Sequence, residues 1–198
     1  MQLHRLTDDQ SFTLKAALSE HNVFITGQSG TGKSFLVKEI FQQLKQSGKN
    51  VAIISSTGIL GTLYKDLKNP VPTVHSFYGV GTGDLPWKLL VQKASSNYVI
   101  QERLRKVDCL IWDEASLTSR RIFEICNVIH LTAGGNTEHK LPFGGKQVVL
   151  LGEFFQLRPV PNQFDDGQFM FCAPLFGRAF LIVISCLLKK YHFIAGAR

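Results

Sequence analysis

The sequence predicts an α/β fold with three layers, in which helices cover both faces of a mainly parallel central sheet. Short apolar runs without polar alternation recur along the chain, and segments with apolar residues at helical spacing lie between them. Uninterrupted apolar runs are typical of parallel strands buried on both faces, and strands that alternate with helices build such sheets. Because ligands bind beyond the carboxyl ends of these strands, we expect functional residues in the loops that follow them.

Apolar runs predict the strands at residues 23–25, 51–54, 109–112 and 147–151, with a further candidate at 181–185. The segments between them predict helices over residues 35–44, 57–67, 87–105 and 120–131. Gly48 is placed to end the first helix and Asn69-Pro70 the second, and a break is expected near residues 95–97 in the third.

Composition limits the classes of partner. The chain has 198 residues, with 22 basic and 15 acidic side chains and a formal net charge of +7. This excess suits a polyanionic partner such as nucleic acid, although basic surfaces that serve only solvation are also common. The longest apolar run, residues 179–188, is about half of the roughly 20 residues that span a bilayer, so no membrane partner is expected. The four cysteines lack the clustered spacing of a zinc site.

A glycine-rich segment follows the first predicted strand and opens the first predicted helix. It matches the pattern G-x-x-x-x-G-K-[ST] in full. Its backbone N–H groups and the helix N-terminus are suited to cradle the phosphates of a nucleotide. Lys33 is expected to reach the β- and γ-phosphates, and Ser34 to ligate Mg²⁺. The residues of this P-loop are Gly27, Gln28, Ser29, Gly30, Thr31, Gly32, Lys33 and Ser34.

An acidic pair, Asp113-Glu114, directly follows the third predicted strand. An acid at the end of a buried strand holds Mg²⁺ in P-loop NTPases, so Asp113 is predicted to bind the metal, through water. Glu114 is predicted to orient and deprotonate the attacking water. The alternative is a solvated pair at the start of a helix, and the P-loop upstream favours the catalytic interpretation. A second acid also favours hydrolysis over the phosphoryl transfer of a nucleotide kinase.

Further segments accompany these two motifs. In chain order they are Leu6-Thr7-Asp8-Asp9-Gln10, Ser55-Ser56-Thr57-Gly58-Ile59, Thr73-Val74-His75-Ser76-Phe77 and Gly152-Glu153-Phe154-Phe155-Gln156-Leu157-Arg158-Pro159-Val160. Together with the P-loop and the acidic pair, they resemble the Pif (petite integration frequency) DNA helicases, which are RecD-like members of superfamily one. The likeness runs from Leu6 to about Phe180. It implies a P-loop NTPase domain of the RecA-like type, with ATP and Mg²⁺ as cofactors.

The resemblance assigns roles to two glutamines. Gln10 matches the glutamine that hydrogen-bonds adenine, which favours ATP over GTP. Without the resemblance, Gln10 would be read as a polar residue at a helix start. Gln156 matches the glutamine that senses the γ-phosphate during catalysis and links it to the DNA groove.

The resemblance also implies contacts with single-stranded DNA. Thr57 and Gly58 match the segment that grips the DNA backbone, and His75, Ser76 and Phe77 match a second segment that faces the strand. Hydroxyl groups, backbone amides and an aromatic ring suit phosphates and stacked bases. A buried Phe77 and a helix-capping Ser76 are the alternatives that the residues leave open.

Family membership would imply an ATP-dependent DNA helicase that moves along single-stranded DNA and unwinds duplex junctions. It would also imply roles in DNA repair, recombination and telomere maintenance, and a nuclear location with the mitochondrion as the alternative.

The predicted motor domain spans residues 1–186, and residues 187–198 form a divergent tail. The second RecA-like domain, which supplies arginine fingers in this family, does not fit in this length. The chain by itself is therefore expected to bind ATP, hydrolyse it slowly and not unwind DNA. A truncated ATP- and DNA-binding module is the alternative.

Some positions depart from the family pattern. Glu153 stands where aspartate is usual, Arg158 where proline is usual, and His192 where arginine is usual. The first change keeps the charge on a longer side chain, and the second adds a cation close to the site. Both changes bear on how ATP hydrolysis is coupled to DNA.

Overall fold

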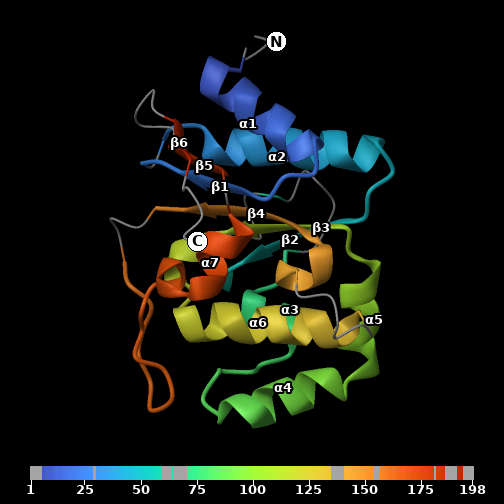
Figure 1. Ribbon diagram of the computed structural model, residues 1–198, viewed down its shortest axis with the longest axis vertical. Helices are drawn as coiled ribbons and strands as arrows, with labels where there is room; N and C mark the ends of the chain where they lie inside the picture. Colours follow the sequence, from blue (N-terminus) through green and yellow to red (C-terminus); the bar gives the residue numbers. More distant parts are fainter. Residues whose placement is uncertain are drawn as a thin grey trace.

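The computed structural model describes residues 6–28, 30–58, 64, 71–134, 141–153 and 157–180, and the backbone of residues 182–185 and 191–193. The described strands form one six-stranded sheet in the order β2-β3-β4-β1-β5-β6 (Figure 1). Neighbouring strands are parallel except β5 and β6, which are antiparallel. The strands are β1 Val23–Thr26, β2 Val51–Ser55, β3 Cys109–Asp113, β4 Gln147–Gly152, β5 Ile182–Ser185 and β6 Tyr191–Phe193.

The predicted strands and the mainly parallel sheet are confirmed. Strand β6 lies within the stretch that the sequence assigned to a C-terminal tail, and it pairs with β5. The tail predicted from residue 187 therefore contributes a strand to the sheet. The helix predicted over residues 57–67 falls mostly outside the described residues.

Helices cover both faces of the sheet, as predicted (Figure 1). Helices α1 and α2 lie on one face, and α3 to α7 lie on the other. None of the described helices is both long and apolar enough to cross a membrane. The helices are α1 Asp8–Leu18, α2 Lys33–Gln46, α3 Val74–Tyr78, α4 Trp87–Ser95, α5 Tyr98–Lys106, α6 Arg120–Ala133 and α7 Pro174–Ala179, with short 3₁₀ turns at Ala115–Leu117, Pro142–Gly145 and Met170–Cys172.

Alternate residues of the central strands pack into two separate apolar cores. Ile25 and Ile111 pack under α1 and α2, whereas their neighbours Phe24 and Trp112 pack against the helices of the other face. Because both faces are covered, neither set of alternating positions has to be polar. This explains why the strands appear in the sequence as uninterrupted apolar runs.

Side-chain caps explain where several helices begin. The predicted break near residues 95–97 is confirmed, and the Asn97 side chain there accepts the first N–H groups of α5. Two further helices begin at threonines: Thr7 forms a capping box with Gln10 at α1, and Thr73 caps α3. The Thr73 hydroxyl accepts from the backbone N–H of Ser76 at 3.2 Å. Thr73, rather than Ser76, is therefore the capping residue.

Candidate functional site

The predicted site assembles at the carboxyl edge of the sheet. The P-loop follows β1, the acidic pair spans the end of β3, and β4 lies between these two strands (Figure 1). Thr26 at the end of β1 pairs with Gly152 at the end of β4, and Ser55 at the end of β2 pairs with Asp113. The loops after these strands, including Thr57, therefore leave the sheet at the same edge, as predicted.

The P-loop curls through glycines with a left-handed backbone. Gly30 has φ 82° and Gly32 has φ 84°, a region that other residues rarely adopt. A Cβ at Gly32 would also lie 2.8 Å from Nε2 of Gln10, so a side chain there would displace the Gln10 amide from the P-loop. Gly32 is the N-cap of α2, which has neither a side-chain cap nor an acidic residue in its first turn. The partial positive charge of this helix end is thus left for an anion, which fits phosphate binding.

Lys33 and Ser34 are the first residues of α2 and are partly buried. Nζ of Lys33 donates to the carbonyl oxygens of Gly27 and Gln28 at 2.5 and 2.8 Å. These bonds hold the ammonium group against the loop, and phosphate oxygens are stronger acceptors of the same kind because they are charged. The predicted cradle residue Ser29 lies outside the described residues.

Gln10 ties helix α1 to the P-loop. Its Oε1 accepts from the backbone N–H of Thr7 at 3.1 Å, and its Nε2 donates to the carbonyl oxygen of Thr31 at 3.4 Å. Thr31 in turn donates its hydroxyl to the carbonyl oxygen of Gln28 at 2.8 Å. Gln10 is therefore both a capping residue at a helix start and a neighbour of the P-loop, and its contact with adenine stays a prediction.

Asp113 is buried at the end of β3, with 8% of its surface exposed. The buried Tyr64 donates its hydroxyl to Oδ2 at 2.5 Å, and the backbone N–H of Glu114 donates to Oδ1 at 2.8 Å. Burial raises the pKa of the Asp113 carboxyl, and these two hydrogen bonds oppose the rise. Burial and the neighbouring carboxylate also raise the pKa of Tyr64, so its proton stays on the phenol.

The hydroxyl of Ser34 and the carboxylate of Asp113 are both neighbours of Tyr64. Their oxygens are the kind of ligand that Mg²⁺ prefers, and together with the glycine cradle they fit a magnesium-bound nucleotide. Tyr64 could not be identified as part of the site from the sequence, because an isolated tyrosine forms no pattern. The available signal is physical: a buried phenol requires a hydrogen-bond partner.

Glu114 has a left-handed backbone, with φ 51° and ψ 35°. For a residue other than glycine, this conformation costs about 1–3 kcal/mol. Its Oε2 accepts a 2.5 Å hydrogen bond from the hydroxyl of Thr57, and both side chains are partly buried. The predicted catalytic acid is therefore in direct contact with a residue predicted to bind DNA.

Phe77 is a core residue in this structure. Its ring is 3% exposed and packs in the apolar core between α3 and the sheet. The Arg103 guanidinium lies 5.3 Å from the ring centroid, and it donates to the Phe77 carbonyl oxygen at 3.0 Å. A buried ring has no open face for a base. The stacking role predicted for Phe77 is therefore not compatible with this geometry, whereas the alternative of a buried Phe77 is.

The other residues predicted to face DNA differ in exposure. Gly58 and Ser76 are exposed, whereas His75 is half-buried. Burial lowers the pKa of the His75 imidazole, and the nearby carboxylates of Asp165 and Asp84 oppose that effect. The DNA contacts of Gly58, Ser76 and His75 stay predictions.

Gln156 lies outside the described residues, so its catalytic role stays a prediction.

Of the positions that depart from the family pattern, Glu153 directly follows β4 and is partly buried. Arg158 is exposed, and its guanidinium lies 5.8 Å from the centroid of the Phe169 ring. His192 lies in β6. The Arg158 cation is therefore held by an aromatic ring of the segment that follows it.

Comparison with known proteins identifies the family that carries this arrangement. The family model for PIF1-like helicase matches residues 5–174. The chain belongs to the PIF1-like helicase family. It is 34% identical over 170 residues to the ATP-dependent DNA helicase PIF1 of Emericella nidulans. The matched region covers 83% of this chain and 22% of that protein. The family resemblance inferred from the sequence motifs is thereby confirmed.

Solved structures of PIF1-like helicases share the fold. The Pif1 helicase of Candida albicans matches with a TM-score of 0.81 and 31% identity, over 93% of this chain and 40% of that chain. Bacteroides Pif1 in complex with ADP-AlF3 and single-stranded DNA matches with a TM-score of 0.70 and 28% identity, over 95% of this chain and 43% of that chain. The RecA-like P-loop fold is confirmed. This chain spans less than half the length of each of these relatives.

Proposed function

We propose that this chain is the first motor domain of a PIF1-like ATP-dependent DNA helicase. In this proposal it couples Mg-ATP hydrolysis to movement along single-stranded DNA and to unwinding of duplex junctions. The observation that carries the proposal is the assembly at one sheet edge. The P-loop and the acidic pair stand on two sides of β4, and the acidic pair is bonded to the segment after β2.

Each side chain of the nucleotide site has a chemical role. Lys33 neutralises charge on the β- and γ-phosphates, and Ser34 and Asp113 hold Mg²⁺ directly or through water. When bound, Mg²⁺ stabilises the negative charge that develops on the transferred phosphoryl group. Glu114 orients the attacking water and accepts its proton. Gln156 senses the γ-phosphate.

Single-stranded DNA is the proposed track of this motor. The net charge of +7 suits a polyanion, Thr57 offers a hydroxyl group just after β2 at the carboxyl edge, and Ser76 offers an exposed hydroxyl group on α3. The Bacteroides relative is in complex with single-stranded DNA and a nucleotide analogue. By analogy, we assign the DNA path to the carboxyl edge, beside the nucleotide.

A second RecA-like domain is part of the proposal, because it supplies arginine fingers. Such arginines accelerate hydrolysis by roughly 10³–10⁵-fold in related NTPases, which is about 4–7 kcal/mol of barrier. This chain alone should therefore bind Mg-ATP, hydrolyse it slowly and show no detectable unwinding. Robust unwinding by the purified monomer would contradict this expectation.

The first test is Mg-ATP turnover by the purified chain, with and without single-stranded DNA, beside Lys33→Ala and Glu114→Gln. We expect DNA-stimulated turnover that falls by about 10²–10³-fold in both variants. Lys49→Ala is the matched control, because the Lys49 ammonium pairs with Glu20 away from the P-loop. It should keep wild-type turnover. Wild-type nucleotide affinity and turnover in Lys33→Ala would contradict the assigned site.

A second candidate is a module that binds ATP and DNA without helicase activity. It uses the same residues, so turnover is the measurement that separates the two. Tight Mg-ATP binding with no turnover, even when DNA is present, would favour the module.

The cellular setting is proposed from the family alone. We assign the protein to DNA repair, recombination and telomere maintenance, and to the nucleus, with the mitochondrion as the alternative. Imaging of the tagged protein in its own cells tests the location, and exclusion from both compartments would contradict it.

A further inference from the structure

The Thr57 hydroxyl has one proton and two available acceptors. In this structure it donates to Oε2 of Glu114 at 2.5 Å. In the proposed function, the same hydroxyl donates to a phosphate of single-stranded DNA. Because a hydroxyl group carries a single donor hydrogen, Thr57 cannot make both bonds at full strength.

The surrounding network fixes the backbone beside Thr57. Ser55 Oγ accepts from the backbone N–H of Thr57 at 3.1 Å. Ser56 Oγ accepts from the indole N–H of the buried Trp112 at 3.3 Å, and it lies 2.7 Å from the Thr118 hydroxyl. The end of β2 is thus bonded to β3 and to the turn after it. A change of partner for the Thr57 hydroxyl therefore requires only a side-chain movement.

The Glu114 side of the contact is also set by the backbone. The left-handed turn at Glu114 and the bond from its N–H to Asp113 fix where its side chain leaves the chain. Among the described residues, Thr57 donates a hydrogen bond to this carboxylate and so contributes to its direction. When Thr57 turns to another acceptor, Glu114 is free to present its oxygens elsewhere.

We propose that single-stranded DNA and Glu114 compete for the hydroxyl of Thr57, so that DNA binding releases the catalytic carboxylate to orient the attacking water. The inference rests on the proposed function, since it takes the contact between Thr57 and a DNA phosphate from there. It gives a route for DNA-stimulated ATP hydrolysis within one domain. The signal passes through a single hydrogen bond, from the loop after β2 to the end of β3.

The competition makes a prediction about DNA binding that does not depend on turnover. Coupling between two contacts is reciprocal, so removal of the Glu114 acceptor must strengthen DNA binding. The test measures the affinity of the nucleotide-free chain for a fluorescent oligo(dT) in the wild type, Glu114→Ala, Thr57→Val and the double variant. We expect Glu114→Ala to tighten binding about tenfold in the wild-type background, because a hydrogen bond to a charged group is lost from the competing state. In the Thr57→Val background, only the smaller effect of the removed charge should remain.

Two further variants serve as controls, and thermal melts establish that each protein is folded. Glu153→Ala removes another carboxylate that follows a strand at the same edge, and its effect on affinity should be equal in both Thr57 backgrounds. Thr57→Ser keeps the hydroxyl and should preserve the tightening by Glu114→Ala.

The outcomes separate the inference from the proposed function. Equal tightening by Glu114→Ala in both backgrounds would overturn the inference, because charge alone would account for it. Unchanged affinity in both backgrounds would overturn it as well. In either case, oligo(dT) binding by the wild type leaves the proposed function standing. If the wild type does not bind oligo(dT), the inference and the proposed DNA contact both fail.

Discussion

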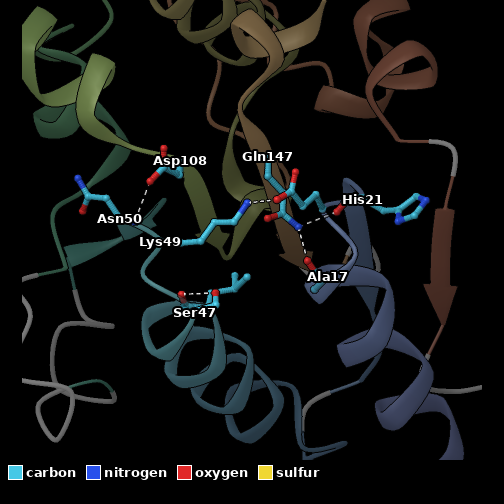
Figure 2. Close-up of polar contacts among 9 residues, drawn as sticks. Ala17, His21, Ser47, Lys49, Asn50, Asp108 and Gln147 are labelled. Atoms are coloured by element: carbon cyan, nitrogen blue, oxygen red, sulfur yellow. Dashed lines mark hydrogen bonds and ion pairs between the residues drawn. The ribbon is translucent and has the colours of Figure 1, made fainter.

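The two edges of the sheet differ in the hydrogen bonds made by Gln147 and by the acidic pair. At the amino edge, Gln147 and Asp108 bond to backbone groups of neighbouring elements (Figure 2), and Lys49 pairs with the side chain of Glu20. Gln147, buried at the start of β4, donates to the carbonyl oxygens of Ala17 and His21 at 2.6 and 3.0 Å. The Asp108 carboxylate accepts from the backbone N–H of Asn50 at 2.9 Å. These bonds join the start of β4 to the end of α1, and the residue before β2 to the residue before β3.

At the carboxyl edge, the carboxylates of Asp113 and Glu114 each accept a hydrogen bond from a side-chain hydroxyl, whereas Lys33 bonds to backbone carbonyl oxygens of the P-loop. Thr57 bonds to Glu114, and Tyr64 bonds to Asp113. The bonds of the buried Gln147 join β4 to the end of α1, whereas the bonds of the two carboxylates to hydroxyl groups can be exchanged for bonds to a phosphate or a metal ion. The amino edge is therefore suited to stability and the carboxyl edge to chemistry, and substitutions should separate the two.

The largest effect on stability is expected from His130, a close neighbour of Lys146 at the amino edge. Burial, and secondly the Lys146 charge, lower the pKa of the His130 imidazole to about 4, against about 6.5 in the unfolded chain. As the pH falls from about 6.5 towards 4, the unfolded state takes up the proton and the folded state does not. The free energy of unfolding should therefore fall by about 3 kcal/mol over this range. Urea denaturation at pH 7 and at pH 4.5 measures it.

The contribution of His130 is isolated by substitution. His130→Phe should flatten the dependence of stability on pH over this range, and His21→Gln, which changes an exposed histidine, should leave it unchanged. An identical dependence on pH in His130→Phe and the wild type would show that other groups cause it.

A smaller effect is expected from Gln147→Leu at the amino edge. The substitution removes two hydrogen bonds and leaves two carbonyl oxygens without that donor, which should lower the free energy of unfolding by about 2 kcal/mol. The affinity for Mg-ATP should not change. Ser47→Ala, which removes a partly buried bond from an exposed residue to the carbonyl oxygen of Leu44, is the control and should have a smaller effect. A large loss of Mg-ATP affinity in Gln147→Leu would break the division between the edges.

Tyr64→Phe sharpens the comparison, because Tyr64 is buried yet belongs to the carboxyl edge. Loss of its bond to a carboxylate should lower the free energy of unfolding by about 1.5 kcal/mol. Asp113 also loses the group that orients it, so ATP affinity should weaken when Mg²⁺ is present and stay unchanged in EDTA. Calorimetric titration under both conditions measures this difference. Equal weakening in both would show that Tyr64 supports the fold rather than the metal ligand.

The features carried by contiguous residues could be predicted from the sequence. The P-loop is one segment between a strand and a helix, so its pattern and its setting are both visible. The position of Asp113 could be predicted for the same reason, since it directly ends an apolar run. The parallel sheet follows from runs that have no polar alternation.

Contacts between distant segments could not be predicted in this way. Thr57 and Glu114 are 57 residues apart and come together where β2 pairs with β3, and Tyr64 and Asp113, which also bond, are 49 residues apart. Phe77 shows a different limit. An aromatic ring that stacks on a base and one that fills a core have the same composition, and only the packing of α3 against the sheet decides between them.

The left-handed backbone of Glu114 affects which substitutions at this position would stabilise the domain. Glycine or asparagine adopts that conformation more easily, so a search for more stable variants would favour them at this position and discard the carboxylate. Stability of the fold and the hydrolytic role proposed for the carboxylate therefore make opposite demands on residue 114.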